Sequence, residues 1–222
     1  MTARLAAADQ EESLEDLPLW AERAIERSPG VRRTPERSLE QAQAIVDAAN
    51  GLVLARGTDF TTQELVNEAG VSLQTFYKAF ESKDELLLAV FEDRIASSCA
   101  IYAAATANLS PMDRLKTFVA VALATQEEAG VEARFITAEH WRLMQIYPAE
   151  VEAATSPYSR LVEKAIVDAV AEGSLEVEDP KAAAWMITQL VMSIFHHRAC
   201  AGEPGVSVGA LWGFCLAAIG GR

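Results

Sequence analysis

Residues 38–87 read SLEQAQAIVDAANGLVLARGTDFTTQELVNEAGVSLQTFYKAFESKDELL, and this stretch decides the fold. It contains three matches to the capping box. In this motif the N-cap hydroxyl accepts a hydrogen bond from the backbone N–H three residues later, and a Glu or Gln side chain at that later position accepts one from the backbone N–H of the N-cap residue. The three pairs are Ser38 with Gln41, Thr61 with Glu64, and Ser82 with Glu85. Each pair predicts the start of a helix.

A tight turn separates the second and third of these predicted starts. It reads Glu-Ala-Gly-Val-Ser over residues 68–72, where Gly70 permits the positive φ that ends a helix and Ser72 is a favoured N-cap for the next. Two short helices joined by a few residues that include Gly are typical of a helix-turn-helix. The second helix of such a unit lies in the major groove of DNA, so the stretch predicts a DNA-binding domain over residues 37–83.

The composition of the 222-residue chain predicts an all-α fold. Half of the residues are hydrophobic, so a substantial core is expected, and glycines and prolines fall at apparent helix boundaries. Neither an Asn-Gly or Asp-Gly hairpin signal nor a sustained period-two alternation occurs. We expect later helices that begin at Lys83, Pro111, Pro157 and Pro180, one that holds residues 134–147, and a last helix that runs to the C-terminus.

Three features predict a cytoplasmic protein. Cys99, Cys200 and Cys215 are widely spaced and form no CxxC motif, which is typical of buried thiols in a reducing compartment rather than of disulfides or a zinc site. The acidic N-terminus lacks the apolar run of a signal peptide. The uncharged segment 204–221 is rich in glycine and has no flanking basic cluster, so we interpret it as a buried or interface helix rather than a membrane span.

The charge of the chain argues against strong non-specific affinity for DNA. The net charge is −13, and residues 37–83 carry four basic and six acidic side chains. Only charges near the phosphates act strongly, however, because the Debye length is about 8 Å at physiological salt. The positions of individual cations therefore matter more than their sum.

The second helix of the unit carries most of the predicted DNA contacts. Gln74 has an amide that can pair with adenine, Thr75 has a methyl group suited to thymine, and Lys78 can reach phosphate or guanine. The full set within the unit is Thr61, Thr62, Ser72, Leu73, Gln74, Thr75, Tyr77, Lys78 and Lys83. The core of the unit is expected to pack Leu65, Ala69, Val71 and Phe76 against Ile45, Ala48 and Leu52.

Residues 1–36 form an N-terminal extension for which two interpretations remain open. Asp16 and Pro18 predict the start of a short helix, whose apolar stripe is Leu17, Trp20, Ala24 and Ile25. A small basic arm follows, with Arg32, Arg33 and Arg37. The extension is either a loosely attached tail or an arm that reaches DNA, as homeodomain arms reach the minor groove.

The motifs of residues 45–87 resemble those of the TetR family of bacterial transcriptional regulators. Segment 48–57 resembles the first helix of the family and its glycine stop, segment 70–80 its turn and recognition helix, and segment 82–86 its link into the next helix. The chain departs from the family at Gly51, Val53 and Val66, where a polar or acidic residue, a bulky aromatic and a small residue are usual. The resemblance implies an N-terminal three-helix helix-turn-helix domain and a C-terminal helical domain, here residues 84–222, that dimerises and binds a small ligand.

Large, soft side chains in residues 84–222 are candidates for the ligand cavity that the resemblance implies. They are Tyr102, Phe118, Phe135, Trp141, Met144, Met192 and Phe195, with His140 and His196 as polar contacts. Each of them also fits an ordinary place in a core or on a surface. His196 and His197 point about 100° apart on a helix, which disfavours a metal site, so no cofactor is expected.

The last two predicted helices carry more apolar surface than a monomer readily buries. The residues predicted at the interface of a homodimer are therefore Trp185, Leu211, Trp212, Phe214 and Leu216. A two-fold dimer would place two recognition helices about 34 Å apart, which is one turn of DNA, on a palindromic operator.

These features favour a DNA-binding transcriptional repressor that a small, largely apolar ligand releases from its operator. The alternative, which the acidic charge favours, is an all-α lipid-handling or enzymatic protein that retains the helix-turn-helix as a scaffold. The sequence contains no Ser-His-Asp pattern, nucleophile elbow, P-loop or His-Glu-x-x-His motif, so we predict no enzymatic activity. A gel shift on the protein's own upstream DNA would separate the two.

Overall fold

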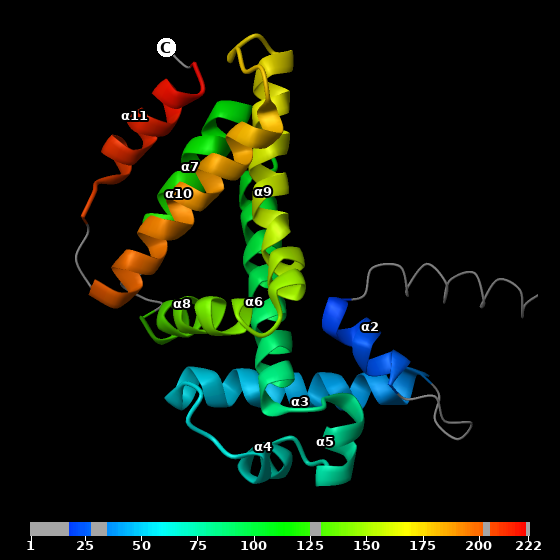
Figure 1. The fold of residues 1–222 in the computed structure, drawn as a ribbon. Coiled ribbons are helices and arrows are strands. Elements are labelled where there is room, and N and C mark those ends of the chain that lie inside the picture. The colour runs from blue at the N-terminus through cyan, green and yellow to red at the C-terminus, as the bar shows by residue number, and fades with distance from the viewer. Residues whose placement is uncertain (1–17, 28–34, 125–129, 202–204, 221–222) are drawn as a thin grey trace, which may run out of the picture. The chain divides into compact units, whose positions relative to one another are not determined.

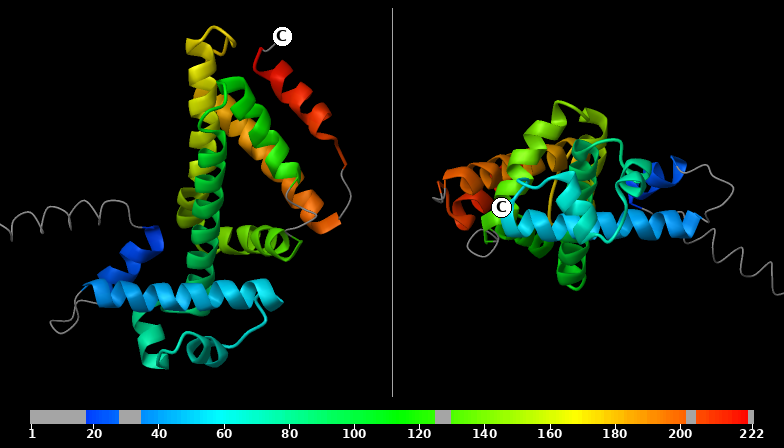
Figure 2. Two further views of the ribbon diagram at one scale, coloured as in Figure 1. Left: turned by 180° about the vertical axis from the view of Figure 1, so that it is seen from behind. Right: turned by 90° about the horizontal axis from the view of Figure 1, so that it is seen from below.

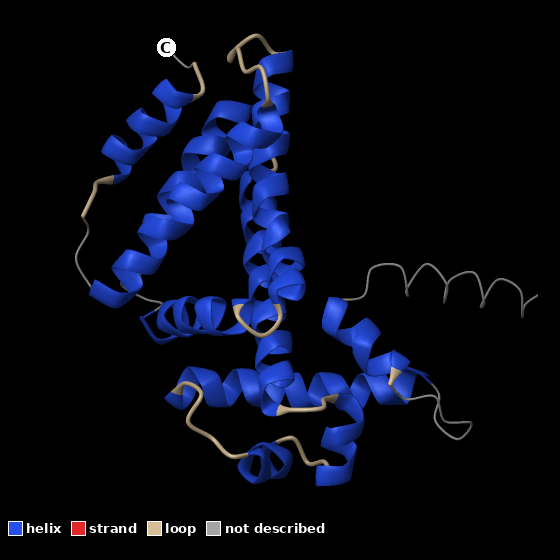
Figure 3. Ribbon diagram, in the orientation of Figure 1, coloured by secondary structure: helices blue, strands red, loops and turns tan. Residues whose placement is uncertain are grey.

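All regular structure in the described part of the chain is helical, which confirms the prediction of an all-α fold (Figure 3). The computed structural model describes residues 18–27, 35–124, 130–201 and 205–220. Within these ranges no helix is long and apolar enough to cross a bilayer. The helices form two compact units, which divide in the sequence between Asp93 and Arg94. They are α2 Leu19–Glu26, α3 Pro35–Arg56, α4 Thr62–Glu68, α5 Leu73–Ala79, α6 Lys83–Thr106, α7 Pro111–Ala124, α8 Gly130–Met144, α9 Pro148–Ala171, α10 Pro180–Ala201 and α11 Val208–Ala218 (Figure 1).

The helix-turn-helix of the first unit is formed by α3, α4 and α5. The capping box of α4 is confirmed, because Thr61 Oγ1 accepts from the N–H of Glu64 at 3.2 Å and the Glu64 carboxylate accepts from the N–H of Thr61 at 2.7 Å. Ser72 caps α5 by accepting from the N–H of Thr75 at 3.0 Å, and Gly70 in the turn has a φ of +65°. The predicted turn chemistry therefore positions both short helices.

The other two capping boxes differ from the prediction. The helix start at Ser38 is wrong: Ser38 is buried inside α3, which begins at Pro35, where the fixed φ of proline suits a first helical turn. At α6, Ser82 accepts from the N–H of Glu85 at 3.1 Å. The Glu85 carboxylate, however, accepts from the N–H of Glu81 at 2.8 Å, one residue before Ser82.

The core of the first unit contains Ile45, Leu65 and Phe76, as predicted, and each is fully buried. The prediction is wrong for Ala48, Leu52, Ala69 and Val71, which are only half-buried. On α3 the buried face instead includes Val46, Ala49 and Val53. Apolar residues surround this alanine-rich helix on several sides, so its sequence pattern does not select one face.

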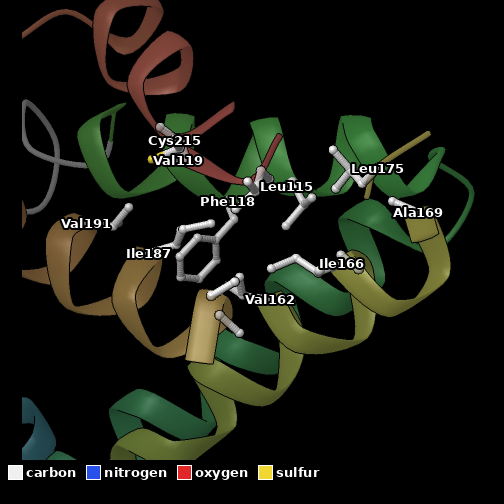
Figure 4. Close-up of a cluster of buried hydrophobic side chains, with 14 of the residues drawn as sticks. Leu115, Phe118, Val119, Val162, Ile166, Ala169, Leu175, Ile187, Val191 and Cys215 are labelled. Carbon is white, nitrogen blue, oxygen red and sulfur yellow. The ribbon is translucent and has the colours of Figure 1, made fainter. Parts of the chain in front are cut away.

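The core of the second unit lies between α7, α9 and α10 (Figure 4). The ring of Phe118 on α7 lies between Val162 of α9 and Ile187 of α10. α11 packs on α7 and adds Leu211 and Cys215 to the same cluster, while α8 packs against α9 and α10 (Figure 2). Helices α7, α8, α9 and α10 thus pack around one another in this unit.

The predicted helix starts at Lys83, Pro111 and Pro180 are confirmed, but the start at Pro157 is wrong. The helix begins at Pro148, and Pro157 lies inside it. A proline inside a helix leaves the carbonyl of the fourth residue before it without its usual N–H donor. Here that carbonyl belongs to Ala153, and it accepts from the hydroxyl of Ser156 at 2.9 Å. A Ser-Pro pair, which is typical of a helix start, can therefore also occur inside a helix.

Candidate functional site

The exposed face of α5 is the candidate DNA-reading surface. Gln74 and Lys78 are exposed, and Tyr77 and Leu73 are 55% and 42% exposed. The opposite face buries Phe76 completely, and its ring meets the ring of Tyr77 edge-on at 5.1 Å between centroids. α5 is therefore anchored on one side and presents amide, phenol and ammonium groups on the other.

Three of the predicted hydroxyl contacts already take part in helix capping. Thr61 Oγ1 donates to the Glu64 carboxylate at 2.8 Å, and Ser72 Oγ lies 2.9 Å from Thr75 Oγ1. Thr62 and Thr75 are in addition half-buried. Any contact of these hydroxyls with phosphate would be made beside the capping bonds. Gln74, Tyr77 and Lys78 offer DNA more open groups.

Lys83 joins the start of α6 to the loop between α3 and α4. Its ammonium donates to the carbonyl of Thr58 at 2.6 Å and to the carbonyl of Phe60 at 2.5 Å, and it lies 4.2 Å from the centroid of the Phe60 ring. An ammonium has three N–H groups, so a phosphate contact has only the third available. The structure therefore gives Lys83 a role in holding this loop.

One acidic side chain of the helix-turn-helix is compensated by an ion pair. Arg56 pairs with Glu64 at 3.1 Å across α3 and α4. The hydrogen bond from the Thr61 backbone, followed by that from its side chain, lowers the pKa of Glu64, so this carboxylate stays ionised and committed to the cap. Arg37 on α3 is exposed, while Arg32 and Arg33 lie outside the described residues.

A cavity of about 300 Å³ lies within the second unit, between α6, α7, α8, α9 and α10. Ile101 and Val121 line it and are 70% and 42% exposed, so apolar side chains extend from the cavity to the surface. Four of the predicted residues lie in its wall: Tyr102, Phe118, Met192 and Phe195. Other lining residues were not predicted from the sequence, among them Arg94, Ile95, Ser98, Ala133, Ile136, Tyr158 and Val191. The spacing of four residues from Arg94 to Ser98 and from Ser98 to Tyr102 is the signal that could have identified the α6 wall.

The polar groups of the cavity wall carry no net charge. Arg94 and Glu132 form an ion pair at 2.8 Å, and their side chains are 16% and 35% exposed. The Tyr102 hydroxyl donates to the carbonyl of Arg114 at 2.5 Å. Burial raises the pKa of Tyr158 to about 12, so its phenol keeps its proton. The wall thus combines apolar surface with neutral donors and a compensated ion pair.

The remaining predicted ligand residues lie outside the cavity lining. Phe135 is buried elsewhere in the unit, and Met144 is half-buried. His140 and His196 face each other across α8 and α10 with ring centroids 5.0 Å apart, and Trp141 lies 5.7 Å from His196. Burial, with His140 as a second cause, lowers the pKa of His196 to about 4. These rings form an aromatic cluster beside the cavity, which it meets at Phe195, whose ring lies 5.8 Å from that of His196. No group of three potential metal ligands occurs among the described residues.

The predicted interface residues fall into two groups. Leu211 is 3% exposed in the core of its own chain, and Trp212 and Leu216 pack partly buried against that core. Trp185 on α10 and Phe214 on α11 are 59% and 64% exposed. Met186, which the sequence analysis did not select, is 58% exposed beside Trp185.

Solved structures with the same fold include several bacterial regulators. A regulatory protein of the tetR family from Rhodococcus RHA1 is 22% identical, with a TM-score of 0.57 over 82% of this chain and 98% of its own. FadR from Bacillus subtilis, solved with stearoyl-CoA, is 16% identical, with a TM-score of 0.59 over 80% and 97%. RolR, solved with resorcinol, is 16% identical, with a TM-score of 0.62 over 85% and 92%. At such identities the similarity shows the fold alone.

Family models match both units of the chain. Residues 45–90 match the model of bacterial regulatory proteins of the tetR family. Residues 108–196 match the model of the tetracyclin repressor-like C-terminal domain. No curated protein matches the sequence. Since the two models together span more than half of its residues, the chain belongs to the TetR family of bacterial transcriptional regulators.

Proposed function

We propose that the protein is a homodimeric repressor that holds a palindromic operator through α5 and leaves it when a small, neutral, largely apolar ligand fills the cavity of the second unit. The cavity is the observation that carries this proposal. A ligand shifts a conformational equilibrium only if it binds one state better than the other, and an apolar cavity provides the surface for such a difference.

Sequence readout rests on α5. Gln74 offers the bidentate amide that pairs with adenine, while Lys78 and Tyr77 reach phosphate beside it. The helix is anchored through Phe76, so these groups approach DNA from a fixed backbone. Residues 37–83 carry only four basic side chains, which makes specific contacts a larger share of the affinity than in a basic DNA-binding domain.

The size and charge of the cavity define the ligand. A volume of about 300 Å³ lies at the lower end of the roughly 300–1,000 Å³ typical of ligand sites, which suits a substituted aromatic ring or a short chain. Arg94 and Glu132 cancel each other, and an ionised ligand would bring an uncompensated charge against an apolar wall. Tyr158 and Ser98 offer polar partners for one hydroxyl or carbonyl group. The binding of resorcinol by RolR supports a ligand of this size in the fold.

Dimerisation rests on the exposed aromatic side chains of α10 and α11. Trp185, Met186 and Phe214 together expose large apolar surfaces that a second copy of the chain would cover. In a two-fold dimer each contact occurs twice, and two copies of α5 face the DNA, as a palindromic operator requires.

The test measures DNA binding and ligand binding separately. Fluorescence anisotropy with a labelled duplex from the protein's own upstream DNA, against a shuffled duplex, measures specific binding. Isothermal titration calorimetry compares three ligands that share a propyl-substituted benzene ring. They are 4-propylphenol, which is neutral, 4-propylbenzoate, which is negatively charged, and 4-propylbenzylamine, which is positively charged. We expect specific DNA binding, preferential binding of the phenol, and loss of the DNA complex when the phenol is added.

The outcomes separate the parts of the proposal. Tighter binding of the benzoate or the benzylamine would contradict the neutral ligand and leave the repressor intact. Ligand binding without any preference for the upstream duplex over the shuffled one would contradict the repressor and favour a lipid-handling protein.

A further inference from the structure

Helix α2 is an integral part of the first unit, although it lies outside residues 45–90, which match the family's DNA-binding model. Trp20 and Ala24 are 1% and 2% exposed, and Ala21 is fully buried. The helix packs against α3 and also contacts α5 (Figure 1). For these residues the interpretation of a loosely attached tail is therefore wrong.

Arg27, the C-cap residue of α2, binds the end of the recognition helix. Its guanidinium donates to the carbonyl of Ala79, the last residue of α5, at 3.3 Å. The last carbonyls of a helix have no partner within the helix and carry partial negative charge, so a cation there is favourable. The same guanidinium pairs with Glu81 at 3.5 Å and with Glu85 in the first turn of α6. Arg27 thus joins the end of α5 to the start of α6.

Arg23 fixes α2 to a later turn of α6. One nitrogen of its guanidinium, Nη2, donates to both carboxylate oxygens of Glu92 at 2.9 Å each, and such charge-assisted hydrogen bonds are stronger than bonds between neutral groups. Glu92 is only 5% exposed, so the pair is shielded from solvent. Both arginines of α2 are therefore used inside the unit, and the exposed side chains of the helix include Glu22 and Glu26.

The recognition helix depends on such neighbours for its orientation. α5 has only seven residues, and isolated helices shorter than about 12–15 residues are marginal in water. Phe76 holds one side of it, and Arg27 holds its C-terminal end. A bond at the end of so short a helix limits its rotation and fraying, which set the positions of Gln74 and Lys78.

We propose that α2 is a positioning element for DNA recognition, in which Arg27 fixes α5 against α6 so that the base-reading side chains are held in one geometry. Arg27 acts through α5, Arg23 holds α2 on α6, and neither side chain touches DNA. This inference rests on α5 being the DNA-reading helix.

The test compares Arg27→Ala with Arg27→Lys and with the exposed double variant Glu22→Ala/Glu26→Ala in the full-length protein. Affinity is measured by anisotropy on a duplex selected from a random pool by the wild-type protein. Hydrogen exchange is measured for the amides of residues 73–80, and circular dichroism verifies that each variant is fully folded at the temperature used.

For Arg27→Ala we expect an operator affinity about tenfold lower, faster amide exchange in residues 73–80, and unchanged exchange in α9 and α10. Arg27→Lys keeps the charge but not the forked donor geometry, so it should fall between Arg27→Ala and the wild type. Glu22→Ala/Glu26→Ala should retain both the exchange rates and the affinity.

A purely stabilising α2 would lower the melting temperature of Arg27→Ala without changing the affinity of the folded protein. Unchanged operator affinity, or unchanged exchange in residues 73–80, would therefore overturn the proposal. If the wild-type protein selects no DNA sequence, the proposed function fails, and the exchange rates alone then decide whether α2 positions α5.

Discussion

The carboxylate of Glu132 lies 2.8 Å from the guanidinium of Arg94, so an ion pair joins α8 to α6 in the wall of the cavity. Both side chains are partly exposed, and solvent therefore weakens their attraction. Their mutual compensation nevertheless gives the cavity its neutral character, which is the basis of the ligand class proposed above.

Replacing only one partner of this pair should be worse than replacing both. Arg94→Met leaves Glu132 with less compensation and should lower the free energy of unfolding by about 1 kcal/mol, while Arg94→Met/Glu132→Leu should recover most of that loss. Urea unfolding of the single and double variants measures this. Equal losses in both would show that the pairing of charges is unimportant here.

Gln74→Ala should weaken operator binding by about 1–3 kcal/mol and leave binding to random DNA nearly unchanged, because base contacts specify the sequence and phosphate contacts position the protein. Anisotropy on the two kinds of duplex measures both values. Gln145→Ala, an exposed amide in the second unit, is the matched control and should change neither. Equal weakening on both duplexes would remove Gln74 from the base-reading set.

Filling the cavity with a side chain should block ligand binding. Ala133 is 3% exposed and lies in the cavity wall, so Ala133→Phe places a ring in the space for the ligand. Calorimetry should then show at least about tenfold weaker binding of 4-propylphenol. Ala103→Phe, at an exposed position of α6 outside the lining, should bind the phenol normally. Retained phenol binding by Ala133→Phe would place the ligand elsewhere.

His196 should make the protein less stable as the pH falls. Its pKa is about 4 in the folded protein, mainly because it is buried, whereas an unfolded chain titrates near 6.5. Between these values the unfolded state binds more protons, so the free energy of unfolding is highest above about pH 6.5 and falls by about 2–3 kcal/mol toward pH 4. Urea unfolding of His196→Gln should show a shallower pH dependence, and His197→Gln, at the exposed neighbour, should match the wild type. A wild-type slope in His196→Gln would contradict this assignment.

Phe214→Glu should produce monomers, because a two-fold interface would bury the new charge twice. Sedimentation velocity measures this directly. Val167→Glu, at an apolar position of α9 that is 47% exposed, introduces the same charge and should leave the dimer intact. A dimer of Phe214→Glu would exclude this part of α11 from the interface. The structure makes Phe214 a better probe than Trp212, which packs partly against its own core.

Local signals predicted the helix-turn-helix because the relevant bonds join residues close in sequence. Thr61 with Glu64 and Ser72 with Thr75 are three residues apart, and the conformation of Gly70 is set within the turn itself. Local signals also placed the start of α9 wrongly, at Pro157. Proline normally disrupts a helix interior, but here the hydroxyl of Ser156 donates to the backbone carbonyl that Pro157 leaves without its N–H donor.

Contacts between distant residues could not be predicted in this way. Arg23 meets Glu92 across 69 positions, and nothing near Arg23 in the sequence indicates that partner. Side-chain size selected Tyr102 and Phe118 for the cavity, but Ser98 and Ala133 carry no such signal. His140 and His196 suited a polar contact with ligand by type, yet the crossing of α8 and α10 brings them to each other.

The most direct test of the central claim, that α5 reads a DNA sequence, is in vitro selection of duplexes from a random pool by the wild-type protein and by Gln74→Ala. The account predicts that the wild type enriches a palindromic motif with half-site centres about one helical turn, or a multiple of it, apart. Gln74→Ala should lose its preference at one symmetric pair of positions within that motif. Failure of the wild type to enrich any motif, or an identical motif for both proteins, would contradict the claim.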